Sequence, residues 1–101
     1  MLPSNGIVLV DFTAAWCGPC RVMKPLLGAL STEYAGRVQF TEVDVDEDPV
    51  LAQHFNVRSM PTFVVLRDGR EVGRFVGSRP RAFVAGVLDR ILSGDVAVTA
   101  P

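Results

Sequence analysis

The sequence predicts a mixed α/β fold, a four-stranded sheet with about three helices, in the order strand, helix, strand, helix, strand, strand, helix. Short apolar runs typical of buried strands alternate with segments whose apolar residues recur at helical spacing. Strands joined by helices pair in parallel, whereas an Asp-Gly pair between the last two strands predicts an antiparallel hairpin. The 101 residues suffice for one domain and are too few for two.

The first predicted strand runs from Ile7 to Phe12 and is apolar on both faces except at Asp11, which suits a central strand covered on both sides. A buried carboxylate in such a strand costs free energy, which suggests that it has a function. Asp11 is therefore the first candidate functional residue.

The first predicted helix follows this strand. After Gly18 and Pro19, apolar residues recur at helical spacing from Cys20 to about Tyr34.

The rest of the chain continues the alternation of predicted strands and helices. An acidic run ending at Asp48, followed by Pro49, is typical of a helix start. The later elements are predicted as a strand from Val38 to Val45, a short helix from Pro49 to about Phe55, strands from Thr62 to Leu66 and from Glu71 to Val76, and a last helix that starts near Pro80 and stops at Gly94. We expect residues 7–92 to form the core of a single domain covering 1–101, with 95–101 as a possible tail.

Composition excludes several function classes. Ten basic and eleven acidic side chains give a net charge of -1, so no global field attracts nucleic acid or an anionic membrane. No apolar run exceeds four residues, whereas a membrane-spanning helix needs about 20. The first six residues do not resemble a secretory signal. We expect a cytoplasmic protein with neither a nucleic acid nor a membrane as partner.

The only two cysteines, Cys17 and Cys20, stand where the first strand leads into a helix. A disulfide between them would close a loop of four residues and stabilise the fold by roughly 1.9 kcal/mol, against about 4.7 kcal/mol for a loop of 100 residues. A disulfide at this position would therefore contribute little to the stability of the fold. At a helix N-terminus, however, a thiolate is stabilised, and a second thiol one turn away can close the ring rapidly. The pattern favours redox chemistry.

Metal binding and an inert pair of thiols remain open as alternatives. A zinc site would need two more ligands. The only histidine, His54, lies in the second predicted helix with no cysteine near it in sequence, and we expect it on the surface of that helix. We therefore expect no metal.

Five segments carry a resemblance to a known family: Val-Asp-Phe-Thr-Ala-Ala-Trp-Cys-Gly-Pro-Cys, Val-Asp-Val-Asp, Met-Pro-Thr-Phe, Asp-Gly and Val-Gly. From Ile7 to about Leu92 the chain resembles the thioredoxins. The resemblance implies a thioredoxin-like fold and a thiol-disulfide oxidoreductase that reduces protein disulfides. It implies no cofactor beyond the cysteine pair, and two kinds of partner: disulfide-containing proteins and a donor such as thioredoxin reductase.

The resemblance also assigns residues. Cys17 matches the attacking cysteine, Cys20 the resolving one, and Asp11 the buried acid that exchanges a proton with Cys20. Pro61 matches the cis-proline that faces the active site. The resemblance implies a flat apolar rim that binds substrate, made of Trp16, Gly18, Pro19, Met60, Pro61, Val76 and Gly77. For Trp16, a place in the core is the alternative.

Two departures from the family matter. Members commonly begin with an extra strand and helix, for which this chain has only six residues before Ile7, so we expect a short form. The strand from Val38 to Val45 would then be an exposed sheet edge, which invites a homodimer. Glu42 stands where many bacterial members carry lysine. It either faces Asp11 and raises a carboxyl pKa or reaches solvent.

A second function class stays open. The chain could be a binding module that clamps a partner through the same apolar rim, with the redox chemistry incidental. Loss of disulfide reduction on replacing Cys17 would favour the enzyme, and a partner function that survives the replacement would favour the module.

Overall fold

The computed structural model describes residues 2–94 and 98–99. Its elements in chain order are β1 (Ile7–Thr13), α1 (Gly18–Glu33), β2 (Val38–Asp44), α2 (Pro49–His54), β3 (Thr62–Arg67), β4 (Arg70–Val76), α3 (Arg81–Leu92) and β5 (Val98–Thr99). The strands form one sheet in the order β2-β1-β3-β4-β5. The pairs β1–β2 and β4–β5 are parallel, while β1–β3 and β3–β4 are antiparallel.

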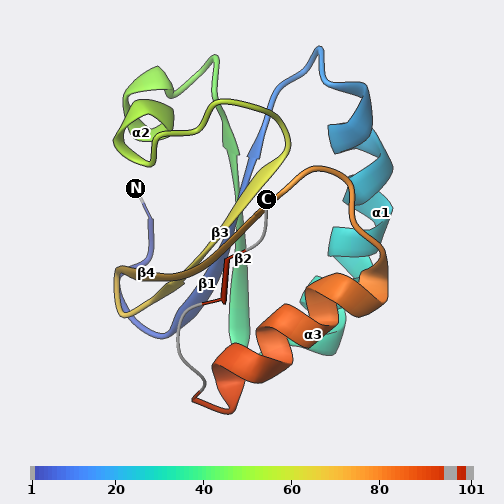
Figure 1. Ribbon diagram of the computed structural model, residues 1–101, viewed down its shortest axis with the longest axis vertical. Coiled ribbons are helices and arrows are strands. Elements are labelled where there is room, and N and C mark those ends of the chain that lie inside the picture. The colour runs from blue at the N-terminus through green and yellow to red at the C-terminus, as the bar shows by residue number, and fades with distance from the viewer. Residues whose placement is uncertain (1, 95–97, 100–101) are drawn as a thin grey trace.

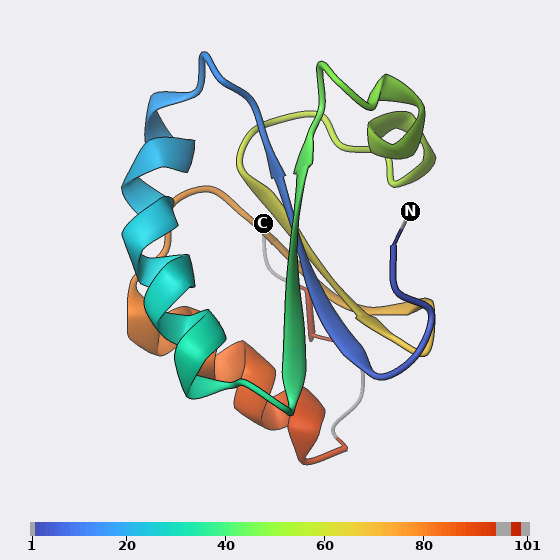
Figure 2. The ribbon, with the colours of Figure 1, turned by 180° about the vertical axis from the view of Figure 1, so that it is seen from behind.

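The sheet lies between two layers of helix. In Figure 1, α1 and α3 lie together on one side of the sheet and α2 lies on the other, and the view from behind in Figure 2 agrees. Crossovers through helices place β2 beside β1 and return the chain to β3, so β1 is flanked by a strand on each side. Among the described residues, β2 is the strand at one edge of the sheet.

Alternation along the strands divides the core in two. Leu9 of β1 packs in the cluster that α1 and α3 cover, whereas its neighbours Val8 and Val10 pack in the cluster that α2 covers. Successive side chains of a strand point to opposite faces. Asp11, two residues after Leu9, therefore faces α1, and this register decides where its carboxylate lies.

The four strands and three helices expected from the sequence are confirmed, in the expected order. Two details differ. The helix α1 begins at Gly18, two residues earlier than predicted, because Cys17 serves as its N-cap and proline is tolerated in a first turn. Val98 and Thr99 form β5, which two residues are too short to reveal by periodicity. The remaining positions of the expected tail, 95–97 and 100–101, lie outside the described residues.

The hairpin between β3 and β4 turns at Asp68 and Gly69, as predicted. Both residues have positive φ, 51° and 84°, which is the geometry of the tight turns that match strand twist. The turn is tied to the segment before β1: the Gly6 amide donates to the Asp68 carboxylate at 2.8 Å. The hairpin thus fixes where β1 enters the sheet.

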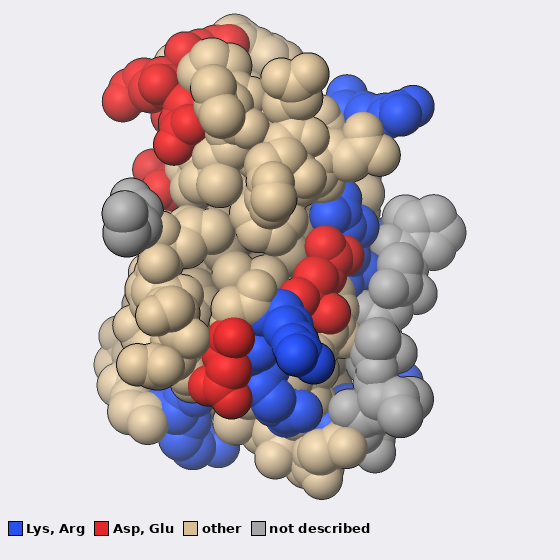
Figure 3. Space-filling model, turned by 90° about the vertical axis from the view of Figure 1, so that its left-hand side faces the viewer, with Lys and Arg blue, Asp and Glu red and all other residues tan. Residues whose placement is uncertain are grey.

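The charges on the α2 side are mixed. Figure 3 shows this face, on which acidic side chains gather at one corner and basic and acidic side chains lie side by side lower down. Glu71 and Arg74 of β4 form an ion pair, with their charged groups 2.8 Å apart. Among the residues coloured there, no single sign of charge covers the face, in keeping with the small net charge.

The two helices of one layer are joined by a buried hydroxyl. The Tyr34 hydroxyl, just after α1, donates to Asp89 of α3 at 2.7 Å. Tyr34→Phe removes this bond to a charged acceptor, and we expect it to lower the free energy of unfolding by about 1.5 kcal/mol in urea titration. The control is Ser93→Ala, which removes an exposed hydroxyl bond at the end of α3 and should change little. Equal stability of Tyr34→Phe and the wild type would contradict this.

Candidate active site

The two cysteines lie at the N-terminus of α1 and are joined by a disulfide, with their Cα atoms 5.4 Å apart. Cys17 has extended backbone geometry and caps the helix: its Sγ accepts a hydrogen bond from the Cys20 amide at 3.2 Å. The amide of Cys17 donates to the Ala14 carbonyl at 3.1 Å, which makes a tight turn between β1 and the helix. The sulfur of Cys17 therefore lies where free helical amides stabilise negative charge.

The loop that contains Met60 lies against the cysteines, and the segment after β4 is tied to that loop. Ala14, Cys17 and Cys20 form a small buried cluster, and Met60 packs against it. The peptide bond from Met60 to Pro61 is cis. The Gly77 amide donates to the Pro61 carbonyl at 2.8 Å, so the segment after β4 lies beside this loop.

The expected rim residues differ in exposure. Gly18 and Pro19 are exposed, while Met60 is half-buried, as are Val76 and Gly77. Pro61 is buried. The structure thus brings the loop before β3 against the cysteines and ties the end of β4 to that loop.

Trp16 lies on the surface, not in the core: 65% of the residue is exposed. Its indole N–H donates to a carboxylate oxygen of Asp46 at 2.9 Å. The loop that carries Asp46 is itself ordered by Asp44, whose carboxylate accepts from the Asp46 amide at 2.8 Å. The sequence predicted helix capping for this acidic run, which holds for Asp48 alone, since its carboxylate accepts from the Leu51 amide.

Asp11 is buried with only 7% of the residue exposed, and its Oδ1 has no hydrogen-bond partner among the described residues. Burial is the main cause that raises the pKa of Asp11 to about 6, from an ordinary value of 3.8. The negative charge of Glu42 raises it further, and the positive charge of Lys24 lowers it. A carboxyl group with this pKa can gain or lose a proton near neutral pH.

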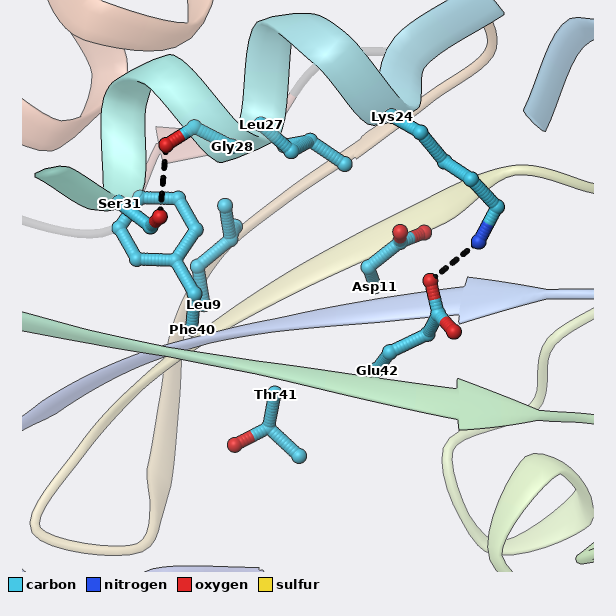
Figure 4. Close-up of a pocket in the computed structure, with 9 residues that line it drawn as sticks. All are labelled: Leu9, Asp11, Lys24, Leu27, Gly28, Ser31, Phe40, Thr41 and Glu42. Carbon is cyan, nitrogen blue, oxygen red and sulfur yellow. Dashed lines mark hydrogen bonds and ion pairs between the residues drawn. The ribbon is translucent and has the colours of Figure 1, made fainter. Parts of the chain in front are cut away.

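Glu42 faces Asp11, as the alternation of strand faces suggested. The two residues are paired in the register of β1 and β2, and both line the same pocket. Figure 4 shows the carboxylates of Asp11 and Glu42 on the same side of the sheet, with Lys24 reaching down from α1 to Glu42. The Lys24 Nζ lies 2.6 Å from a carboxylate oxygen of Glu42. Glu42 therefore faces Asp11 and also reaches solvent, since about half of its side chain is exposed.

Comparison with known proteins identifies the family. The family model described as Thioredoxin matches residues 1–90. A thioredoxin of Staphylococcus aureus is 43% identical over 88 residues, which are 87% of this chain and 85% of that protein. The oxidised form of mitochondrial thioredoxin 3 from Saccharomyces cerevisiae superposes with a TM-score of 0.77 at 42% identity, covering 84% of this chain and 79% of that one. The chain belongs to the thioredoxin family.

A second solved structure gives the same result. A chain from a structure titled for the thiol-resolving mechanism of a yeast mitochondrial 1-Cys peroxiredoxin via glutathione and thioredoxin systems is 41% identical, with a TM-score of 0.77. The cysteine pair at the start of α1 is thus set in a thioredoxin fold. The protein is a thiol-disulfide oxidoreductase, which the resemblance of the sequence implied.

Sequence reasoning found some of the site and missed some of it. It placed both cysteines and Asp11, and it placed His54 on the surface, where the structure has it. It missed Lys24, although the helical position four residues after Cys20 was a usable signal. It also missed Asp46 as the partner of Trp16, for which no periodic pattern gives a signal. Among the residues that the structure describes, no cluster of metal-binding side chains and no helix able to cross a membrane is found.

The raised pKa of Asp11 makes a prediction about stability. Between its ordinary value of 3.8 and about 6, the folded chain holds a proton that the unfolded chain has lost, so stability falls as pH rises through this window. Asp11→Asn removes the cost of burying the charge, and we expect a gain of about 2 kcal/mol near pH 8 and little change near pH 4. Urea titrations at both pH values measure this, and a variant less stable than the wild type near pH 8 would contradict it.

Proposed function

We propose that the protein reduces disulfides of other proteins, with Cys17 as the attacking residue and Cys20 as the resolving residue. The observation that carries this is the place of Cys17 as N-cap of α1, with its Sγ accepting the Cys20 amide. The thiolate is the attacking species in thiol-disulfide exchange, and the N-terminus of a helix stabilises this charged form. Cys17 attacks one sulfur of the substrate disulfide, that bond breaks, and a mixed disulfide forms.

Cys20 then completes the exchange. Its thiol loses a proton, its sulfur attacks Cys17, and the substrate leaves as a dithiol while the chain is left with the disulfide seen here. Because the two cysteines are three residues apart, this step is intramolecular and fast. We assign the acceptor of the Cys20 proton to Asp11, whose burial and pKa of about 6 support that role.

The substrate site in this proposal is the rim predicted from the sequence. Three features support it: the exposed Trp16 beside Cys17, Met60 packed against the cysteine cluster, and the tie between Pro61 and Gly77. We propose that an extended segment of the substrate lies along Met60 and pairs with its backbone as a strand would.

The remaining assignments follow from the chemistry. The disulfide form must be recharged with two electrons, so the second partner is a reductase such as thioredoxin reductase. The activity needs no cofactor other than the cysteine pair, and no metal. A reductase of this type works where thiols are kept reduced, which supports a cytoplasmic location.

Replacing Cys17 by serine tests the proposal. The hydroxyl is not an effective nucleophile at neutral pH, so we expect reduction of insulin disulfides to fall at least about 1,000-fold, to the rate without protein. Turbidity of the precipitating insulin chains measures the rate, with dithiothreitol as electron source. The matched control is Ser59→Ala, at an exposed position before Met60, which should keep the activity. Activity retained in Cys17→Ser would refute the proposal and favour a binding module.

We further propose a homodimer through β2. This strand is a sheet edge among the described residues, and Phe40 on it is only half-buried beside the pocket under α1. An unpaired edge can extend its hydrogen bonds to a second copy.

Size-exclusion chromatography over a range of concentrations tests the dimer. We expect the elution volume to shift toward the dimer as concentration rises, and Thr41→Lys to abolish the shift by placing a charge on the edge. A single monomeric species at all concentrations would reject this interface.

A further inference from the structure

The pocket that contains Asp11 lies between α1 and the strands β1 and β2. Its volume is about 310 Å³, and Leu9, Leu27 and Phe40 supply apolar walls. At one end Asp11, Lys24 and Glu42 come from three different elements, as Figure 4 shows. The Asp11 Oδ1 there is buried without a partner, so the charges beside it act on a poorly solvated carboxyl group.

From this arrangement we propose that Lys24 is a positioning residue for proton exchange at Asp11: it holds the Glu42 carboxylate in place beside Asp11 and offsets the negative charge of Glu42. The proposal rests on the role assigned to Asp11 under Proposed function. In this proposal Lys24 acts only through the carboxyl groups of Glu42 and Asp11 and takes no direct part in the exchange at the cysteines.

The geometry supports a matched pair rather than two independent charges. The Nζ of Lys24 lies 2.6 Å from Glu42, a short distance for a charge-assisted bond. Glu42 is the neighbour of Asp11 in the parallel register, so its side chain rises from the same face of the sheet. Without Lys24, a full negative charge would remain beside a buried carboxyl group. Without Glu42, the ammonium group alone would face it.

Among the described residues, Glu42 and Lys24 are the two charged groups that shift the pKa of Asp11. On β3 the residue opposite Asp11 is the apolar Phe63. On α1, the cysteines are neutral while they are joined as a disulfide. The hydrogen bond to Glu42 is the main cause that raises the pKa of Lys24, and the negative charges of Asp11 and Asp44 raise it further, which keeps Lys24 charged. The balance at Asp11 therefore depends on Lys24 and Glu42.

A double-mutant cycle on the oxidised protein tests the proposal. The titration midpoint of Asp11 is followed by the NMR shift of its side-chain carboxyl carbon in the wild type, Lys24→Met, Glu42→Gln and the double variant. We expect the midpoint to rise by about 0.5 pH unit in Lys24→Met and to fall by about as much in Glu42→Gln. In the double variant the midpoint should return close to that of the wild type. Both side chains are about half exposed, so the substitutions spare the core.

Two further measurements separate charge from structure. Lys24→Arg keeps the positive charge and should restore the wild-type midpoint. Lys24 is the only lysine in the chain, so lysine-selective ¹⁵N labelling gives one ammonium signal, whose shift should change in Glu42→Gln if the ion pair forms in solution. The pH dependence of insulin reduction should move in the same direction as each midpoint.

The outcomes are distinct. Unchanged midpoints in both single variants, or shifts of the same sign, would overturn the role of Lys24. Midpoints that shift as expected while the pH profile of reduction does not move would retain the charge balance but refute the role of Asp11 in catalysis, and with it the role proposed for Lys24 in the reaction.

Discussion

Burial of β1 on both faces is the constraint on which the site depends. With α2 on one side and α1 on the other, β1 has a fixed register, and its side chains alternate between two apolar clusters. That register turns Asp11 toward α1 and ends the strand where a tight turn brings Cys17 to the start of the helix. The position of β1 thus determines how the buried acid lies relative to the helix N-terminus and the disulfide.

The same burial creates an electrostatic cost that the surroundings only partly offset. A carboxylate without a hydrogen-bond partner is destabilising in an apolar pocket, and the proton affinity of Asp11 rises accordingly. A purely structural site would favour an apolar residue there. Retaining an acid makes the fold less stable above the pKa of that acid. In the proposed reaction, the same acid accepts the proton that Cys20 loses. The charges of Glu42 and Lys24 act on the proton affinity of Asp11 from positions outside the core.

Much of this could be read from the sequence because it is local. The spacing of the cysteines, the apolar strand interrupted by Asp11 and the hairpin at Asp68 and Gly69 are patterns within short segments. Contacts between distant segments were harder to see. The bond from Trp16 to Asp46 depends on how the loop after β2 lies beside the loop before α1, and the bond from Lys24 to Glu42 depends on how α1 packs across β2. The start of α1 was missed because cysteine is not a usual helix cap, and β5 because it is too short.

In the proposed reaction, Cys17 carries the mixed disulfide and Cys20 resolves it. Mass spectrometry of Cys20→Ser after reaction with a protein disulfide tests both roles. Without a resolving thiol, we expect a stable mixed disulfide, one substrate chain per molecule, mapped to the peptide that contains Cys17 and released by dithiothreitol. No covalent adduct at Cys17, with substrate still reduced at the wild-type rate, would refute these roles.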